Sequence, residues 1–266
     1  MSIQDADKDL MSISRFLSYM RCPALYKAVY IDKSLPRTFN IHAHVGSTVH
    51  LAHELLCKHL RDFDEIPPLA DLQDEIKKYW DSKLSNSTEL LENLLMQEKL
   101  ANRLIETYFK FFQTADIKPR FIEKHAVWYP PGYDFGIQGY IDRIDEDGHV
   151  CDLKTSGKSP PKSRATGKYY VPRSMGYDLQ MDTYFLLARE ALNIDVPGGS
   201  FEYVVKTKTP KVVRVNYDVD DLHVNSTLDL MANLHNAISK GNFPPNRLGP
   251  FCSPQSCANW HPCTGL

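Results

Sequence analysis

The chain has 266 residues, 42% hydrophobic and 24% charged, which is the balance of an ordinary globular protein and enough to bury one large core. A net charge of −2 excludes a globally basic protein, so any contact with nucleic acid has to come from a local patch. No apolar run is long enough to span a membrane, and the N-terminus lacks the pattern of a secretory signal, so we expect a cytoplasmic location.

The first part of the chain is predicted to be helical. Ser14 is placed to cap a helix that ends near Tyr30, while Pro23 equally favours a helix–turn–helix over the same stretch. Residues 31–44 are expected to form a loop. Apolar residues at helical spacing then predict three helices, over 46–60 with Ser47 or Thr48 near its start, over 71–85 and over 87–113.

From Arg120 the apolar period changes and strands are predicted. The order of elements indicates an α/β fold with a mixed central sheet flanked by helices. The expected strands cover 121–129, 135–145, 150–153, 201–205 and 212–217, and the expected helices cover 177–192 and 222–238.

We expect a single domain with three regions. Residues 11–115 form a mainly helical lobe, residues 120–240 form the core, and residues 241–266 form a cysteine-rich clasp together with Cys22. No internal repeat or long linker divides the chain.

The stretch Gly139–Thr155, GYIDRIDEDGHVCDLKT, predicts a β-hairpin with an acidic turn. If the hairpin folds about Asp147, Asp142 and Asp152 lie opposite each other, and opposed like charges destabilise a strand pair. Either one of the two is protonated or a positive charge lies between them, and a divalent cation such as Mg²⁺, which takes carboxylate oxygens as ligands, would supply that charge. Alternation places Lys154 on the face of Asp152, where its ammonium can orient water or stabilise charge growing on phosphate. The alternative is an ordinary surface hairpin with a polar face.

A basic segment follows the hairpin, because no acidic residue occurs from Leu153 to Tyr177. Beyond it, Gln180 and Tyr184 lie four residues apart and project from one face of the predicted helix. Basic side chains can contact phosphates and tyrosines can stack on bases, whereas a solvated loop is the alternative. The expected DNA-binding residues are Lys158, Lys162, Arg164, Lys168, Tyr169, Tyr170 and Arg173.

Three of the six cysteines lie close together near the end of the chain, at Cys252, Cys257 and Cys263. Three thiolates need a fourth ligand to complete a tetrahedral zinc site or a [4Fe–4S] cluster. Cys22 is the natural candidate, since it lies at the predicted helix break, and His261 is a rival if the metal is zinc. The alternative is a set of incidental thiols.

Together, in their order along the chain, these motifs resemble the RecB-like branch of the PD-(D/E)xK nuclease superfamily. The resemblance is strongest to members with an iron–sulfur cluster, such as the AddB-type and CRISPR-adaptation nucleases, and the fold it implies is restriction-endonuclease-like. The motifs that carry it are Ser12-x-Ser14 with Cys22-Pro23, Gly46-x₃-His50, Gly139-Tyr140-Ile141-Asp142, Asp152-Leu153-Lys154-Thr155, Gln180-x₃-Tyr184 and Phe243-Pro244-Pro245.

The resemblance implies an active site around the hairpin. Mg²⁺ or Mn²⁺ would be bound by three side chains and one backbone carbonyl, and three further side chains would assist the attacking water or position DNA. The cation ligands would be His50, Asp142, Asp152 and the carbonyl of Leu153, Lys154 would assist the water, and Gln180 and Tyr184 would position DNA.

The resemblance also implies that Cys22, Cys252, Cys257 and Cys263 hold a [4Fe–4S] cluster. The family usually spaces the first two C-terminal cysteines as C-x₂-C, whereas this chain has C-x₄-C. Zinc therefore stays the alternative to iron and sulfide.

These observations predict a metal-dependent DNA exonuclease that acts on single-stranded ends in recombination, repair or phage DNA processing. The alternative is a DNA-end-binding module of a repair or spacer-acquisition complex with little or no cleavage, and RNA is a further possible substrate. The sequence has no G-x₄-GK[ST] P-loop, so any motor would come from a helicase or recombination partner.

Overall fold

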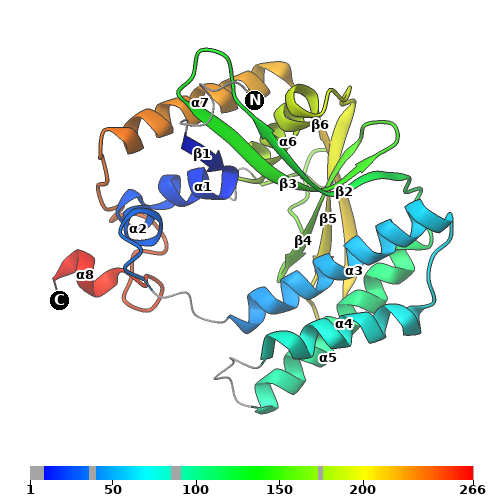
Figure 1. Cartoon of the computed structure of the whole chain (residues 1–266). Coiled ribbons are helices and arrows are strands. Elements are labelled where there is room, and N and C mark those ends of the chain that lie inside the picture. The colour runs from blue at the N-terminus through cyan, green and yellow to red at the C-terminus, as the bar shows by residue number, and fades with distance from the viewer. Residues whose placement is uncertain (1–8, 36–39, 85–90, 173–175, 266) are drawn as a thin grey trace. The chain divides into compact units, whose positions relative to one another are not determined.

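The computed structural model describes residues 9–35, 40–84, 91–172 and 176–265 (Figure 1). The chain divides into two compact units. Unit 1 consists of Met1–Thr38, Ala126–Gly139 and Asp220–Leu266, and unit 2 consists of Phe39–His125 and Tyr140–Val219.

Unit 2 begins with a helical layer made of α3 (Ile41–Phe63), α4 (Leu69–Leu84) and α5 (Leu91–Phe112). The helix expected at Gly46 therefore starts earlier, and the loop expected over residues 31–44 ends before Ile41. The reason is the cap: the Asn40 side-chain oxygen accepts hydrogen bonds from the N–H groups of the first turn, at 3.0 and 3.1 Å. The predicted caps Ser47 and Thr48 lie within the helix, where their hydroxyls donate to backbone carbonyls one turn earlier.

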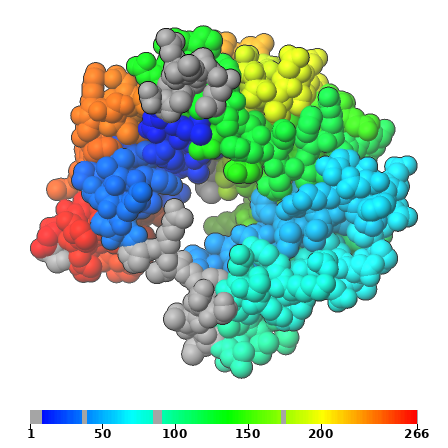
Figure 2. All heavy atoms as spheres, viewed as in Figure 1, coloured from blue at the N-terminus to red at the C-terminus, as the bar shows by residue number. Residues whose placement is uncertain are grey.

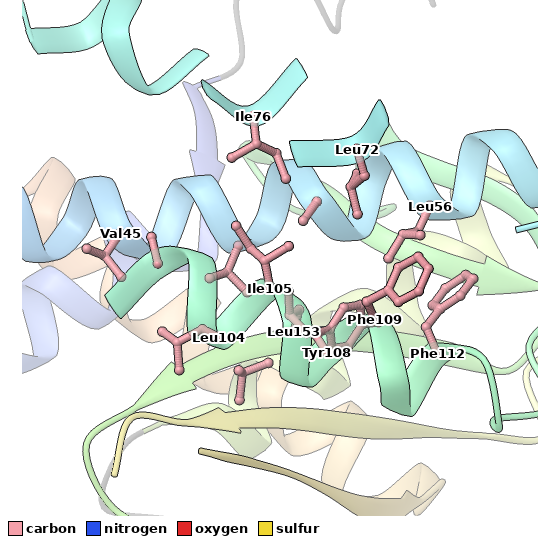
Figure 3. Close-up of a cluster of buried hydrophobic side chains, with 14 of the residues drawn as sticks. Val45, Leu56, Leu72, Ile76, Leu104, Ile105, Tyr108, Phe109, Phe112 and Leu153 are labelled. Atoms are coloured by element: carbon pink, nitrogen blue, oxygen red, sulfur yellow. The ribbon is translucent and has the colours of Figure 1, made fainter. Parts of the chain in front are cut away.

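The core of unit 2 lies between this helical layer and a sheet (Figure 3). Apolar side chains spaced three and four residues apart on α3 and α5 face each other and are closed off by α4. Leu153 and Val204 contribute to the same cluster from two strands. The labelled members in Figure 3 are Val45, Leu56, Leu72, Ile76, Leu104, Ile105, Tyr108, Phe109, Phe112 and Leu153.

The sheet of unit 2 mixes parallel and antiparallel pairs. The end of β3 (Phe135–Asp145) is antiparallel to β4 (Val150–Ser156), β4 is parallel to β5 (Gly198–Val205), and β5 is antiparallel to β6 (Lys211–Asp218). β2 (Pro119–Trp128) also pairs with β3.

A second helix covers the other face of β4. α6 (Tyr177–Leu186) contacts β4 and continues into a short π-helical segment, η4 (Leu187–Ala191). Since Leu153 faces α3 and α5, strand alternation turns Asp152 toward α6. The predicted α/β class, with helices flanking a mixed sheet, is confirmed.

Unit 1 starts with a strand that the sequence did not predict. β1 (Asp9–Ser12) runs parallel to Phe135–Gln138 of β3, and α1 (Ile13–Arg21) follows directly. Ser12, rather than the predicted Ser14, caps this helix, because its extended backbone lets its hydroxyl accept a 3.4 Å hydrogen bond from the Arg15 N–H.

The remaining elements of unit 1 are helical. The helical stretch breaks at Cys22, as Pro23 favours, and resumes as α2 (Pro23–Tyr26) and the π-helical η2 (Lys27–Ile31). The last elements are α7 (Asp221–Ser239) and α8 (Trp260–Thr264). Among the described residues, no helix combines the length and the apolar character needed to cross a membrane.

Candidate functional site

The hairpin of β3 and β4 has the register that the sequence predicts. Arg143 pairs with Cys151 and Ile144 with Val150, so the next pair along brings Asp142 opposite Asp152. The turn closes through a 3.0 Å hydrogen bond from the Gly148 N–H to the Asp145 carbonyl, with Gly148 at a φ of +85°.

Asp142 lies at the centre of the site and is 7% exposed. Its Oδ2 accepts a 2.7 Å hydrogen bond from the backbone N–H of Leu153. The same oxygen lies 3.5 Å from Nδ1 of His50, which projects from α3. The predicted association of His50 with the hairpin is therefore present in the structure.

Asp152 is buried and held on both of its oxygens. The ammonium of Lys154 lies 2.6 Å from Oδ2, and the side-chain amide of Gln180 donates a 3.0 Å hydrogen bond to Oδ1. Burial raises the pKa of the Asp152 carboxyl, the charge of Lys154 opposes this, and the charge of Asp142 adds to it. The lysine therefore favours the ionised carboxylate in a site that otherwise penalises it.

α6 supplies Gln180, which contacts Asp152 directly, and Tyr184, which contacts Gln180. The Gln180 amide also donates a 2.8 Å hydrogen bond to the hydroxyl of Tyr184, one helical turn later. Lys154 is held from another side, since its ammonium lies 5.1 Å from the ring centre of Tyr177. These contacts fix the positions of Asp152 and Lys154 relative to α6.

Glu123 is a site residue that the sequence did not single out. It lies in β2 with a φ of +47°, and its carboxyl belongs to one group with His50 and Asp142 whose potential ligand atoms all lie within 4.8 Å of one another. Burial raises the pKa of Glu123 to about 7, and the charges of Asp142 and Glu54 add to the effect. A predicted strand gives no sign of such a turned side chain, because the sequence does not reveal where alternation breaks.

The donor atoms of this group fit a divalent cation. Two carboxylates and an imidazole are the ligands such ions take from proteins. Glu123 and His50 also line an open pocket of about 520 Å³, which gives the group access to solvent. Asp152, a predicted ligand, lies outside the 4.8 Å group among the described residues.

The neighbouring histidine on α3 has a different environment. His53 is fully buried, and its Nδ1 lies 2.6 Å from the hydroxyl of Tyr108, which donates a 2.7 Å hydrogen bond to Glu202. It is a core residue on the helical side of the sheet, three positions from His50.

The basic segment follows β4 and is exposed. Lys162 and Tyr169 form an isolated β-bridge, and the lysine ammonium lies 4.5 Å from the ring centre of the tyrosine. Arg173 lies outside the described residues. The other predicted DNA-binding residues that are solvent-exposed are Lys158, Arg164, Lys168 and Tyr170.

The four predicted cluster cysteines line one cavity of unit 1, of about 390 Å³. All four thiols are free of disulfides. The backbone N–H of Asn246 donates a 3.4 Å hydrogen bond to the sulfur of Cys22. Within the described part of the chain, no three of these sulfur atoms lie within 4.8 Å of one another. The cysteines are Cys22, Cys252, Cys257 and Cys263.

The model of the PD-(D/E)XK nuclease superfamily matches residues 10–264. The chain belongs to this superfamily. It is therefore a metal-dependent nuclease by family, and the restriction-endonuclease-like fold expected from the sequence is confirmed. A nuclease of this superfamily needs divalent cations, which agrees with the donor group around Asp142.

The fold is similar to that of a solved structure of comparable length. A candidate exonuclease from Eubacterium rectale has a TM-score of 0.58 at 17% identity, over 94% of this chain and 89% of that chain. At this identity the likeness supports the fold alone. A second structure, SSO0001, covers 87% of this chain and 88% of its own at 15% identity, with a TM-score of 0.30 that carries no weight. No curated protein matches the sequence.

Proposed function

We propose that this nuclease is a Mg²⁺- or Mn²⁺-dependent deoxyribonuclease and that it degrades single-stranded DNA from an end. The observation that carries the proposal is the arrangement of Asp142 and Asp152 on paired strands, with His50 at 3.5 Å from one and Lys154 at 2.6 Å from the other. The fold shared with the candidate exonuclease of Eubacterium rectale is in keeping with an exonuclease.

The cation would be held on the hairpin by His50, Asp142 and Asp152. The backbone carbonyl of Leu153 is a further ligand in this proposal. The N–H of Leu153 donates to the Asp142 side chain. Because the N–H and C=O groups of a strand residue point toward the same side of the strand, the Leu153 carbonyl also faces Asp142. When bound, the cation would supply activation of water and neutralisation of charge at phosphorus.

Lys154 would orient the attacking water and stabilise negative charge that develops on the phosphate. Its ammonium is fixed by Asp152 and by the ring of Tyr177, so little reorganisation is needed during the reaction. Gln180 and Tyr184 would position DNA. The Gln180 amide donates to Asp152 and to the Tyr184 hydroxyl, which holds both side chains beside the site and supports that role.

The exposed basic segment would guide DNA to the site. Its lysines and Arg164 would contact phosphates, together with Arg173, and its two tyrosines would stack on unpaired bases. Tyr170 is 49% exposed and is open to such stacking. A stack on unpaired bases favours single-stranded DNA over duplex. The sequence lacks a P-loop, so a helicase or recombination partner would separate the strands of a duplex.

The cysteines of unit 1 would bind a [4Fe–4S] cluster, and the chain would then belong to the iron–sulfur branch of the superfamily. Tetrahedral zinc with sulfur at about 2.3 Å needs sulfur atoms about 3.8 Å apart. Among the described residues no three of these thiols lie within 4.8 Å of one another, which is in keeping with a group larger than a single zinc ion. The cavity of about 390 Å³ between them leaves room for such a group. A single domain with this clasp at its ends is the organisation that we propose.

Cleavage of labelled DNA with Mn²⁺, compared with EDTA, tests the proposed activity. Asp152→Asn removes the negative charge of a proposed ligand and Lys154→Met removes the ammonium, so each should slow cleavage by at least about a hundredfold. Binding of single-stranded DNA, measured by fluorescence anisotropy, should be retained in both variants. Linear single-stranded, blunt duplex and circular substrates separate end-dependent from internal cutting.

The control for this experiment is Lys78→Met. This substitution also removes an ammonium, but Lys78 is exposed on α4 and is not one of the site residues. Cleavage by both site variants at the rate of the unaltered protein would overturn the assignment. Tight binding of DNA ends without any cleavage by the unaltered protein would favour the end-binding module instead.

A further inference from the structure

Three elements converge on one group of potential ligand atoms. His50 comes from α3, Asp142 from β3 and Glu123 from β2, and their donor atoms all lie within 4.8 Å of one another. Asp142 is buried, whereas His50 and Glu123 are partly exposed at the open pocket. The group therefore combines one buried carboxylate, that of Asp142, with two side chains that solvent can reach.

The backbone of β2 is distorted at Glu123. A φ of +47° is rare for a residue with a side chain and costs free energy, so it persists where the surroundings impose it. The alternation of buried and exposed side chains also fails here, since Phe121 to Lys124 are all half-buried. The local turn directs the glutamate toward the hairpin instead of leaving it on a regular strand face.

The Glu123 carboxyl has no hydrogen bond or ion pair with any described residue. Nearby cations are engaged elsewhere: Lys58 forms a 2.5 Å ion pair with Glu54, and Lys154 is paired with Asp152. The carboxylates of Glu123 and Asp142 thus lie in one group, and no described lysine or arginine forms an ion pair with Glu123. A bound divalent cation supplies the missing positive charge.

We propose that Glu123 is a ligand of the divalent cation, together with His50 and Asp142. Asp152 is already held by Lys154 and Gln180, so a site made of the hairpin carboxylates alone is short of free protein ligands. β2 thereby becomes part of the metal site, and Asp142 is the carboxylate shared by both sets of ligands. This inference rests on the proposed function and extends it.

Binding of Mn²⁺ alone to the full-length protein, without DNA, tests the inference. Free Mn²⁺ is followed by electron paramagnetic resonance, and heat of binding by calorimetry. Glu123→Gln keeps the size of the side chain and removes the charge, and it should weaken binding by about 10- to 100-fold. Glu54→Gln is the matched control, because Glu54 lines the same pocket but lies outside the group. We expect it to change the affinity less than about threefold.

The outcomes separate this inference from the proposed function. No Mn²⁺ binding by the unaltered protein would contradict both. Binding by the unaltered protein and by Glu123→Gln with equal affinity would overturn only the role of Glu123. An equal loss in Glu123→Gln and Glu54→Gln would overturn it as well, since the pocket's charge and not ligation would then set the affinity.

Thermal unfolding gives a readout that does not depend on activity. In EDTA at pH 8, Glu123→Gln should unfold at the same or a higher temperature than the unaltered protein, because repulsion from Asp142 is removed. With Mn²⁺ its unfolding temperature should rise less. If the variant is less stable in EDTA but gains as much from Mn²⁺ as the unaltered protein, Glu123 is a structural residue and the inference is wrong.

Discussion

Glu202 carries a buried negative charge at the centre of unit 2. Arg143 and Arg214 donate to the same oxygen at 3.1 and 2.7 Å, and Tyr108 donates to the other at 2.7 Å. Burial acts to raise its pKa, but Arg143 and the other neighbours hold the pKa well below its usual range. The network joins α5, β3, β5 and β6. Arg143 follows Asp142 on β3, so the network limits movement of the strand that carries this aspartate.

His53 contacts the Tyr108 hydroxyl at the edge of this network. From its burial we expect the stability of the protein to depend on pH. Burial lowers its pKa to about 4, and Arg143 adds to the effect. Below about pH 6.5 the unfolded chain binds a proton that the folded protein excludes, so the stabilisation falls as pH falls from there toward 4. Between pH 7 and pH 5 the folded protein should lose about 2 kcal/mol from this residue.

Urea unfolding of the unaltered protein and of His53→Gln at both pH values measures this loss. The variant cannot take up the proton, so the free-energy difference between the two proteins should shift by about 2 kcal/mol in favour of the variant at pH 5. A difference that stays constant with pH would show that His53 does not titrate as its burial requires.

At the scale of elements, the hairpin depends on a turn that only glycine can form. Gly148 has a φ of +85°, and a Cβ added there would overlap the backbone carbonyl oxygen of Asp195. Gly132, in the preceding turn, has a similar φ of +82° but open space around it. The two glycines therefore separate the cost of the backbone conformation from the cost of a steric clash.

Alanine substitution at these positions should have unequal effects. Gly132→Ala should reduce the free energy of unfolding by about 1 kcal/mol through its positive φ alone. Gly148→Ala should cost at least about 2 kcal/mol more, because backbone atoms must shift, and should also weaken Mn²⁺ binding by disturbing the hairpin register. Chemical denaturation and Mn²⁺ titration measure both effects, and equal losses would contradict the clash.

At the scale of the whole molecule, unit 1 joins the first helices of the chain to the segment that follows α7. The hydroxyl of Tyr19 donates a 2.5 Å hydrogen bond to the carbonyl of Asn242, and the Asn246 side chain donates a 3.0 Å bond to the carbonyl of Arg21. Figure 2 shows the red atoms of the C-terminal segment beside blue atoms from the first part of the chain. The cysteine cavity lies in this contact.

If this cavity holds a [4Fe–4S] cluster, protein purified without oxygen should contain about four iron and four sulfide per chain. Cys22→Ser should lower the iron content and expose the segment after Gly249 to limited proteolysis, because the link between Cys22 and the C-terminal segment is lost. Cys57→Ser is the control, since Cys57 is buried in unit 2. Bound zinc without iron or sulfide would refute the iron–sulfur assignment.

The sequence by itself determined the features that depend on short-range geometry. Strand alternation and the acidic turn set the register that opposes Asp142 and Asp152, and the same period brings Lys154 beside Asp152. Helical spacing put Gln180 next to Tyr184. Each of these contacts is fixed by a few consecutive residues and does not depend on distant packing.

Tertiary structure decided the rest of the site. His50 reaches Asp142 because α3 packs on the sheet, and the helix begins at Ile41 because Asn40 caps it. Glu123 joins them through a backbone distortion, and no residue type in β2 predicts that distortion. The physical reason is that long-range packing and local strain depend on the whole folded chain. The period of apolar and polar residues, in contrast, is a property of each short segment.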